Sequence, residues 1–254
     1  MLSRIEAKLV KISQSFFYFF VWMTHYLLFS PFLSIKVIGK ENIPKRGRFI
    51  LAGNHKNFLD GYFLSFAIGP FKKVSFVIAK RALRPKPLQI LARLIGSVLI
   101  GNEIEEYQRA IKKLNRILSH GGCIGIFPEG DVSNRSTPRK FKGGVARLSL
   151  DSTTKVVPIY LTGTYNLRYL KYWLKRPEIL IKIGKPVELY KYASVYGNNL
   201  DEMAAFLREK IIELAELNEI KKNINLDLNN SSDSEPLLNI LNEPKRKSHV
   251  SVLD

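Results

Sequence analysis

Two residues that could form a proton-transfer pair, His55 and Asp60, lie five positions apart in the segment 54–60, Asn-His-Lys-Asn-Phe-Leu-Asp. On one continuous helix they would point about 140° apart, at roughly 3.6 residues per turn. They can meet if His55 stays in a loop and Asp60 enters the first turn of a helix. The carboxylate would then hold one imidazole nitrogen and leave the other free as a base. Such a dyad has no protein nucleophile, so the substrate must supply one.

A second segment, 125–130, reads Gly-Ile-Phe-Pro-Glu-Gly and places a carboxylate in a turn after an apolar run. Hydroxyl and cationic side chains follow it as far as Lys142, and Gly143 and Gly144 open a helical stretch. A helix N-terminus near Arg and Lys residues is a typical phosphate site. Each segment by itself could also be ordinary surface: an incidental His and Asp in the first case, and a solvated turn in the second.

The elements that must position these residues alternate between strands and helices. Short apolar runs bounded by turn residues predict strands at 49–53, 74–79, 97–100, 123–127, 156–162 and 179–183. Helical periodicity begins near Ile104, with Asn102 as its predicted cap, and again at Leu200, with Asn199 as its predicted cap. This alternation predicts an α/β fold with a mainly parallel central sheet flanked by helices. Both segments would follow strand carboxyl ends, where such sheets hold their ligands.

An aromatic stretch over residues 12–35 contains no Lys, Arg, Asp or Glu. It is long enough to cross a bilayer, which takes roughly 20 residues, but polar residues interrupt it and its aromatic content suits the interface. Basic residues flank both ends, so the positive-inside rule assigns no orientation. We expect residues 1–35 to form a membrane-associated helical anchor that dips into one leaflet; a true span and a soluble core helix are the alternatives. No small-residue cleavage site follows, which argues against a signal peptide.

The composition sets the outer bounds. At 254 residues and 46% hydrophobic, the chain can bury a full core. Its net charge of +18 implies an anionic partner, such as nucleic acid, an anionic membrane, or an acidic carrier or cofactor. The single cysteine, Cys123, excludes an internal disulfide and lies in an apolar run. Basic and aromatic residues interleave over 165–176 and could face lipid headgroups or nucleic acid. From 218 the composition turns polar, so we predict a central domain over 36–217 and a disordered tail over 218–254.

Taken together, the two segments resemble the motifs of the glycerolipid acyltransferase family, whose best-known members are the 1-acylglycerol-3-phosphate acyltransferases. The resemblance covers roughly residues 36–190. It rests on Asn-His-x4-Asp at 54–60, Phe-Pro-Glu-Gly at 127–130 and Val-Val-Pro-Ile at 156–159, with further similarity at 79–83, 96–100 and 141–148.

The resemblance implies an O-acyltransferase of phospholipid biosynthesis. It would move a fatty-acyl group from an acyl-CoA or acyl-carrier-protein thioester to a lysophospholipid, with 1-acylglycerol-3-phosphate as the expected acceptor and phosphatidic acid as the product. His55 would be the general base and Asp60 would orient it. The residues expected at the substrate site are Asn54, Phe127, Pro128, Glu129, Gly130, Arg135, Lys142, Gly143 and Pro158. No metal and no cofactor beyond the acyl thioester is required. The expected partners are both substrates and membrane lipid but no nucleic acid, with the active site on the cytoplasmic side.

Two arginines that the family commonly uses to grip glycerol phosphate are absent from their places. Asn102 stands at the end of the second motif and Val132 in the third. Arg135, Arg139 or Lys142 could substitute, whereas Asp131 would repel a phosphate. One alternative is therefore an acyltransferase of the same family with another lysolipid acceptor, such as a lyso-aminolipid. A nucleic-acid-binding module, suggested by the charge alone, is the remote alternative.

Overall fold

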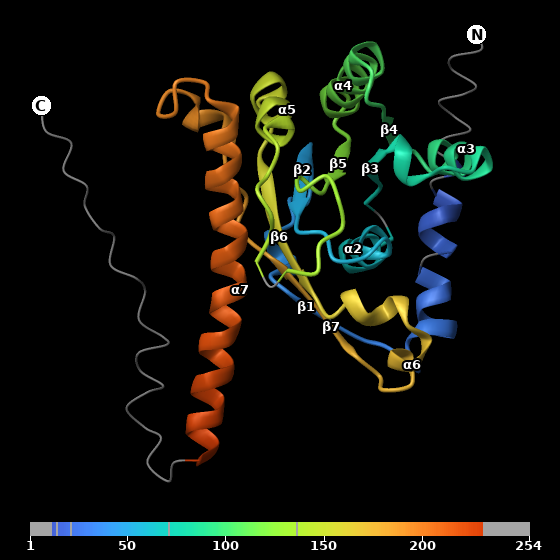
Figure 1. Cartoon of the computed structure of the whole chain (residues 1–254), viewed down its shortest axis with the longest axis vertical. Coiled ribbons are helices and arrows are strands. Elements are labelled where there is room, and N and C mark those ends of the chain that lie inside the picture. Colours follow the sequence, from blue (N-terminus) through green and yellow to red (C-terminus); the bar gives the residue numbers. More distant parts are fainter. Residues whose placement is uncertain (1–11, 14, 21, 71, 136, 231–254) are drawn as a thin grey trace, which may run out of the picture. The chain divides into compact units, whose positions relative to one another are not determined.

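The computed structural model describes residues 12, 13, 15–20, 22–70, 72–135 and 137–230. Figure 1 shows its helices and strands in the colours of the sequence. In chain order the strands and α-helices are β1 (Ser34–Ile38), β2 (Phe49–Gly53), α2 (Asp60–Ile68), β3 (Val74–Ala79), α3 (Lys86–Leu94), β4 (Val98–Ile100), α4 (Ile104–Ser119), β5 (Cys123–Ile126), α5 (Gly144–Ser152), β6 (Val156–Thr162), α6 (Leu170–Trp173), β7 (Glu178–Ile183) and α7 (Leu200–Asn230). Short 3₁₀ turns at Lys40–Asn42, Lys80–Ala82, Tyr165–Arg168 and Leu189–Ala193 connect them.

The strands form one seven-stranded sheet in the order β1-β7-β6-β2-β5-β3-β4. From β6 to β4 all neighbours are parallel; β7 is antiparallel to β6, and β1 is parallel to β7. The predicted α/β fold with a mainly parallel sheet is confirmed. The chain passes from β5 to β6 across β2, so the loop after β2 lies where the winding direction changes. Open α/β sheets bind their ligands at such a point.

Apolar side chains fill both faces of this sheet. One core includes Phe63 and Leu64 of α2, and the other includes Leu114 of α4, Val145 of α5 and Leu207 of α7. All five residues of β2 are buried, as expected of a central parallel strand covered on both sides. The strand that ends just before His55 is therefore held rigidly.

The predicted strands are found with bounds that differ by at most one residue at either end. One strand was not predicted: β1 begins at Ser34, inside the range assigned to the anchor. Its residues are alternately exposed and half-buried, since it is an edge strand that pairs only with β7. The anchor boundary at residue 35 is accordingly wrong, and the sheet begins at Ser34.

Helix α7 corrects the predicted tail. It continues to Asn230, so 218–230 is helical, whereas 231–254 lies outside the described residues. The sequence places Leu217, Ile220 and Ile224 three and four apart, a helical spacing that the polar composition obscured. By its contacts the chain divides after Leu214, inside α7.

The two predicted helix caps have different outcomes. Asn199 caps α7 as predicted: its side-chain oxygen accepts from the backbone N–H groups of Asp201 and Glu202 at 3.1 and 3.3 Å. Asn102 does not cap α4. The cap position is Glu103, whose side chain makes no capping hydrogen bond.

The N-terminal segment is helical at 12–13, 15–20 and 22–24 and continues as a π-helix over His25–Phe29. It packs on α2 through Trp22 and Phe66, whose rings lie 5.5 Å apart. The buried Tyr18 hydroxyl donates to the Val74 carbonyl at 3.2 Å. No helix in the described part of the chain combines the length and apolar character needed to cross a membrane. Residues 1–11 of the predicted anchor lie outside the described residues.

Candidate active site

His55 and Asp60 meet at the carboxyl end of β2. His55 lies in the loop after the strand, and Asp60 is the first residue of α2. His55 Nδ1 lies 2.8 Å from Asp60 Oδ2. The loop-to-helix geometry that the five-residue spacing required is therefore present. Because a carboxylate only accepts hydrogen bonds, Nδ1 donates, which leaves Nε2 as the unprotonated nitrogen of the neutral ring.

Asp60 is completely buried and accepts three further hydrogen bonds. The backbone N–H groups of Lys56 and Asn57 donate to Oδ2 at 2.6 and 2.8 Å. The Thr164 hydroxyl donates to Oδ1 at 2.7 Å. Four donors on one carboxylate stabilise its negative charge and fix its orientation. The histidine therefore faces a carboxylate that cannot rotate away from it.

The imidazole is held by the second segment. The Phe127 ring stacks on the His55 ring with centroids 4.3 Å apart and planes 10° apart. One oxygen of Glu129 accepts from the His55 backbone N–H, and the other accepts from the Arg139 backbone N–H, both at 2.9 Å. Ser133 N–H in turn donates to the His55 carbonyl at 2.8 Å. Both oxygens of Glu129 are occupied by backbone groups, so this buried residue joins the two loops and positions His55.

Asn54, predicted at the substrate site, is held by strand β6. It is fully buried, its amide nitrogen donates to the Leu161 carbonyl at 2.8 Å, and its amide oxygen accepts from Leu161 N–H at 2.7 Å. Both ends of the amide thus pair with β6. Asn54 therefore positions the His55 loop, and its contact with substrate stays a prediction.

Pro158 and Pro128 are also buried. Pro158 lies inside β6, level with Ala52 rather than with the loop that follows β2. It packs against Gly184, where an added Cβ would lie 2.8 Å from Pro158 Cγ. Its role at the substrate site stays a prediction. Pro128 accepts a hydrogen bond from Lys142 N–H at 3.0 Å and so anchors the loop that carries the basic residues.

That loop carries the basic residues Arg135 and Lys142. Gly130 has φ 76°, and a Cβ on it would lie 2.6 Å from Lys142 Nζ, so the lysine lies across this glycine. The exposed Arg135 offers its carbonyl to the amine of the buried Lys56. Burial lowers the pKa of Lys56, opposed by the charges of Glu129 and Asp60. Gly143 precedes α5, and a Cβ there would lie 2.9 Å from Cβ of Leu200, so Gly143 serves helix packing.

Asp131, expected to repel a phosphate, has a partner. Arg81 donates to its carboxylate at 3.0 Å and lies 3.4 Å from the Gly130 carbonyl. The ion pair is exposed but offsets the negative charge beside the loop.

Asn57 and Thr164 also position the dyad, and the sequence did not reveal Thr164. Asn57 donates from its side chain to the Thr164 carbonyl at 3.0 Å, so the loop after β6 is joined to the loop that carries His55. Thr164 lies 104 positions from Asp60, and only its place just after a strand could have suggested a role. Across the described residues, no group of three or more His, Cys, Asp or Glu is placed to hold a metal ion.

Comparisons with known proteins show the family to which this chain belongs. The family model named Acyltransferase matches residues 34–162. The 1-acyl-sn-glycerol-3-phosphate acyltransferase of Borreliella burgdorferi is 27% identical over 189 residues, 72% of each chain. The protein of that name from Bacillus subtilis is 24% identical over 181 residues, 71% of this chain and 87% of its own.

Among solved structures, the 1-acyl-sn-glycerophosphate acyltransferase PlsC from Thermotoga maritima shares the fold. Its TM-score is 0.54 at 21% identity, with 80% of this chain and 82% of that chain covered. Since the family model matches more than half of the sequence, the chain belongs to the glycerolipid acyltransferase family and is an acyltransferase.

Proposed function

We propose that this enzyme of phospholipid biosynthesis acylates the free hydroxyl of 1-acylglycerol-3-phosphate and so forms phosphatidic acid. The donor is an acyl-CoA or an acyl-carrier-protein thioester. The names of the curated relatives support the acceptor. The observation that carries the mechanism is the 2.8 Å contact between His55 Nδ1 and Asp60 Oδ2.

In the proposed mechanism Nε2 of His55 takes the proton of the acceptor hydroxyl. The hydroxyl oxygen attacks the thioester carbonyl carbon, and the tetrahedral intermediate expels the thiolate. The thiolate then takes the proton from the imidazolium and leaves as the thiol. Asp60 stabilises the imidazolium between these transfers. The Phe127 stack and the Glu129 contacts hold the ring, because small displacements of a base reduce catalysis strongly.

The acceptor phosphate requires cations beside the dyad. We propose that Lys142, which lies across Gly130, takes this role with Arg135 of the same loop. The Arg81 pair with Asp131 reduces the local repulsion that a phosphate would meet. The altered positions Asn102 and Val132 favour one alternative, an acyltransferase that accepts another lysolipid headgroup.

Membrane association is part of the proposal. The N-terminal helical segment exposes Phe16, Phe19 and Phe20, and α3 exposes Leu88, Ile90, Leu91 and Leu94. Exposed apolar side chains in this number are typical of an interfacial surface. In the described residues near α6, Arg168 stacks on Tyr165 and Tyr169. We propose that this basic aromatic stretch contacts lipid headgroups, with the active site on the cytoplasmic side.

The test is mass spectrometry of the lipids that the purified protein makes from a panel of lysolipids and both donor types. We expect phosphatidic acid, and loss of product when His55 is replaced by alanine. His120→Ala is the matched control, because His120 is exposed at the end of α4, where its ring contacts the Arg116 carbonyl. Product from another lysolipid alone would establish the alternative acceptor. Full activity of the His55 variant would refute the base.

A further inference from the structure

A cavity of about 270 Å³ lies at the carboxyl edge of the sheet, beyond the dyad. It follows the ends of β3 and β4. The residues that line it are Lys80, Arg93, Val98, Leu99, Gly101, Glu106, Arg109, Ala110 and Lys113. Four of its side chains are cations and one is a carboxylate, so its walls are strongly positive.

Most of that positive charge is not neutralised. Lys80 pairs with Glu106 at 2.5 Å. Among the described residues, Arg93, Arg109 and Lys113 have no carboxylate within ion-pair distance. Burial lowers the pKa of Lys113, and the charge of Arg93 lowers it further. Cations that repel one another in a cavity are stabilised by an anion between them.

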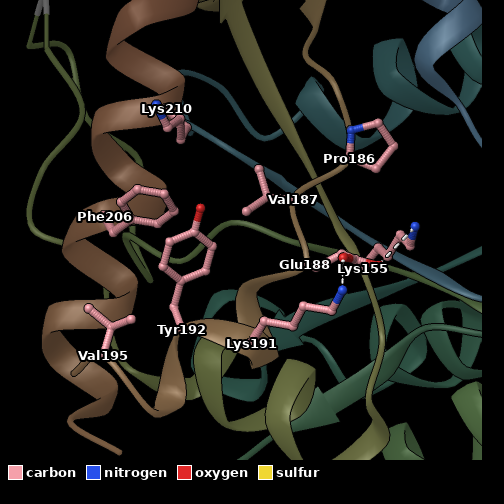
Figure 2. A pocket seen from close by; sticks show the side chains of 9 residues that line it. All are labelled: Lys155, Pro186, Val187, Glu188, Lys191, Tyr192, Val195, Phe206 and Lys210. Atoms are coloured by element: carbon pink, nitrogen blue, oxygen red, sulfur yellow. Dashed lines mark ion pairs between the residues drawn. The ribbon is translucent and has the colours of Figure 1, made fainter. Parts of the chain in front are cut away.

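In a second cavity, by contrast, the cationic side chains are paired with carboxylates. It measures about 520 Å³ and lies at the amino end of β6, the opposite edge of the sheet. Figure 2 shows Glu188 between Lys155 and Lys191, with contacts of 3.1 and 2.6 Å. Its third lysine, Lys210, pairs with Glu213 at 2.7 Å. Each of these three lysines contacts a carboxylate, two of them the same one. Positive charge alone therefore does not distinguish the cavity beside β4, whereas the lack of carboxylate partners does.

Distance indicates which phosphate the cavity beside β4 could bind. In the sheet Leu51 is level with Gly125 and Phe76, and the next residue, Val77, is level with Val98. Strand β4 lies three strands from β2. Neighbouring strands are about 4.8 Å apart, so the two strand ends are separated by about 14 Å.

The acceptor phosphate cannot reach so far, because it lies within about 5 Å of the reacting hydroxyl at ordinary bond lengths. The pantetheine arm of the donor can. Roughly twelve bonds join its sulfur to its phosphate oxygen, and at about 3.5 Å for each three-bond unit it spans about 14 Å. We propose that Arg93, Arg109 and Lys113 bind the phosphate at the far end of this arm while the thioester lies beside His55.

This inference rests on the proposed acyl transfer and extends it to the donor subsite. The strand ends between the two places are linked by consecutive residues. Lys80 lines the cavity, and Arg81 contacts Gly130 and Asp131 of the loop after β5. A pantetheine arm laid along these ends passes from the cavity to the dyad. CoA and the phosphopantetheine group of an acyl carrier protein share this phosphate.

The test compares the double variant R93A/R109A with the intact protein on three donors. With acyl-CoA or acyl-carrier protein, the donor KM should rise at least tenfold, since charge-assisted contacts to phosphate are lost. The acceptor KM should not change. With acyl-S-N-acetylcysteamine, which has no phosphate, the two proteins should have equal activity. The matched control K191A/K210A removes two lysines from the cavity at the amino edge and should leave the donor KM unchanged.

Two additions identify the source of the phosphate and separate this inference from the proposed function. Adenosine 3′,5′-bisphosphate should compete with the donor if CoA is used, and should not if the carrier protein is used. Calorimetric binding of CoA and of 4′-phosphopantetheine reports on the cavity without turnover. Unchanged donor KM together with unchanged binding in R93A/R109A would overturn the inference. Absence of transfer from every donor would overturn the proposed function. The calorimetric measurement would then show by itself whether the cavity binds the phosphate.

Discussion

The two edges of the central sheet carry cavities that look alike in composition but differ in their chemistry. At the amino edge, Lys155 and Lys191 share Glu188, and Lys210 pairs with Glu213. At the carboxyl edge, Arg93, Arg109 and Lys113 share the space with a single carboxylate that is already paired with Lys80. A basic cavity attracts an anion only to the extent that its own carboxylates leave charge uncompensated. The net charge of +18 therefore indicates less about where an anion binds than the local pairing of the charged side chains does.

The carboxylates near the dyad also differ from those at the amino edge of the sheet. Every oxygen of Asp60 and Glu129 at the carboxyl edge is engaged by donors that position His55. At the amino edge, Glu188 engages lysines alongside Tyr190. Substitutions should accordingly affect catalysis at one edge and only local electrostatics at the other.

The largest effect is expected for Asp60→Asn. The amide cannot stabilise an imidazolium as a carboxylate does, so kcat should fall by about a thousandfold with little change in either KM. Thiol release under saturating substrates measures this. Asp151→Asn, which removes an exposed pair with Arg147 on α5, is the matched control and should retain activity. A comparable loss in both variants would show that the effect is one of folding.

Glu129→Gln should have the next largest effect. A carboxylate satisfies the backbone N–H groups of both His55 and Arg139, whereas an amide turns its own N–H₂ toward one of them. An unsatisfied buried donor costs about 1–3 kcal/mol. We expect a lower Tm and a kcat reduced by roughly tenfold to a hundredfold, followed by calorimetry and kinetics. An unchanged Tm would contradict the role of Glu129 as the link between the loops.

Glu106→Gln should lower the donor KM, whereas R93A/R109A should raise it. The substitution removes the one carboxylate of the cavity beside β4 and keeps its shape. That shape matters, because a Cβ at Gly101 would lie 1.7 Å from Glu106 Oε2. The donor KM should fall severalfold, with no change for acyl-S-N-acetylcysteamine. A rise would mean that Glu106 organises Lys80 for binding rather than limiting the charge.

The smallest effect belongs to Glu188. Hydrogen bonds from Lys191 and Lys155 lower its pKa to about 2. Its stabilising contribution should be complete above the ordinary value of 4.5 and lost as the pH falls through about 2. A carboxyl-detected NMR titration measures this directly. Glu188→Gln should leave the donor KM unchanged; a change would break the distinction between the two edges.

The sequence predicted local features well and long-range contacts poorly. The bounds of β2 and the His55–Asp60 geometry could be predicted because apolar runs and the five-residue spacing are local patterns. Thr164 could not, because its contact with Asp60 depends on β6 lying beside β2 in the sheet. Asn54 is informative for the same reason: a polar residue beside the dyad suggested substrate contact, whereas its hydrogen-bond partner is the backbone of β6. Edge strand β1 was not predicted because its first two residues, Ser34 and Ile35, belong to the uncharged aromatic stretch 12–35 that was assigned to the anchor.

The buried Tyr18 hydroxyl has a consequence for how attachment to lipid is measured. Burial raises the pKa of this phenol from 10.0 to about 12, so its contact with Val74 weakens as the pH rises through that interval. Alkaline carbonate, the usual means of stripping peripheral proteins from vesicles, has a pH inside this interval. There the packed phenol is still mostly protonated but a released phenol is ionised, so the wash reduces the stability of the packed N-terminal segment. Retention after such a wash would therefore reflect both lipid contact and a partly opened protein. Extraction with concentrated salt at neutral pH leaves the phenol protonated and tests the lipid contact alone.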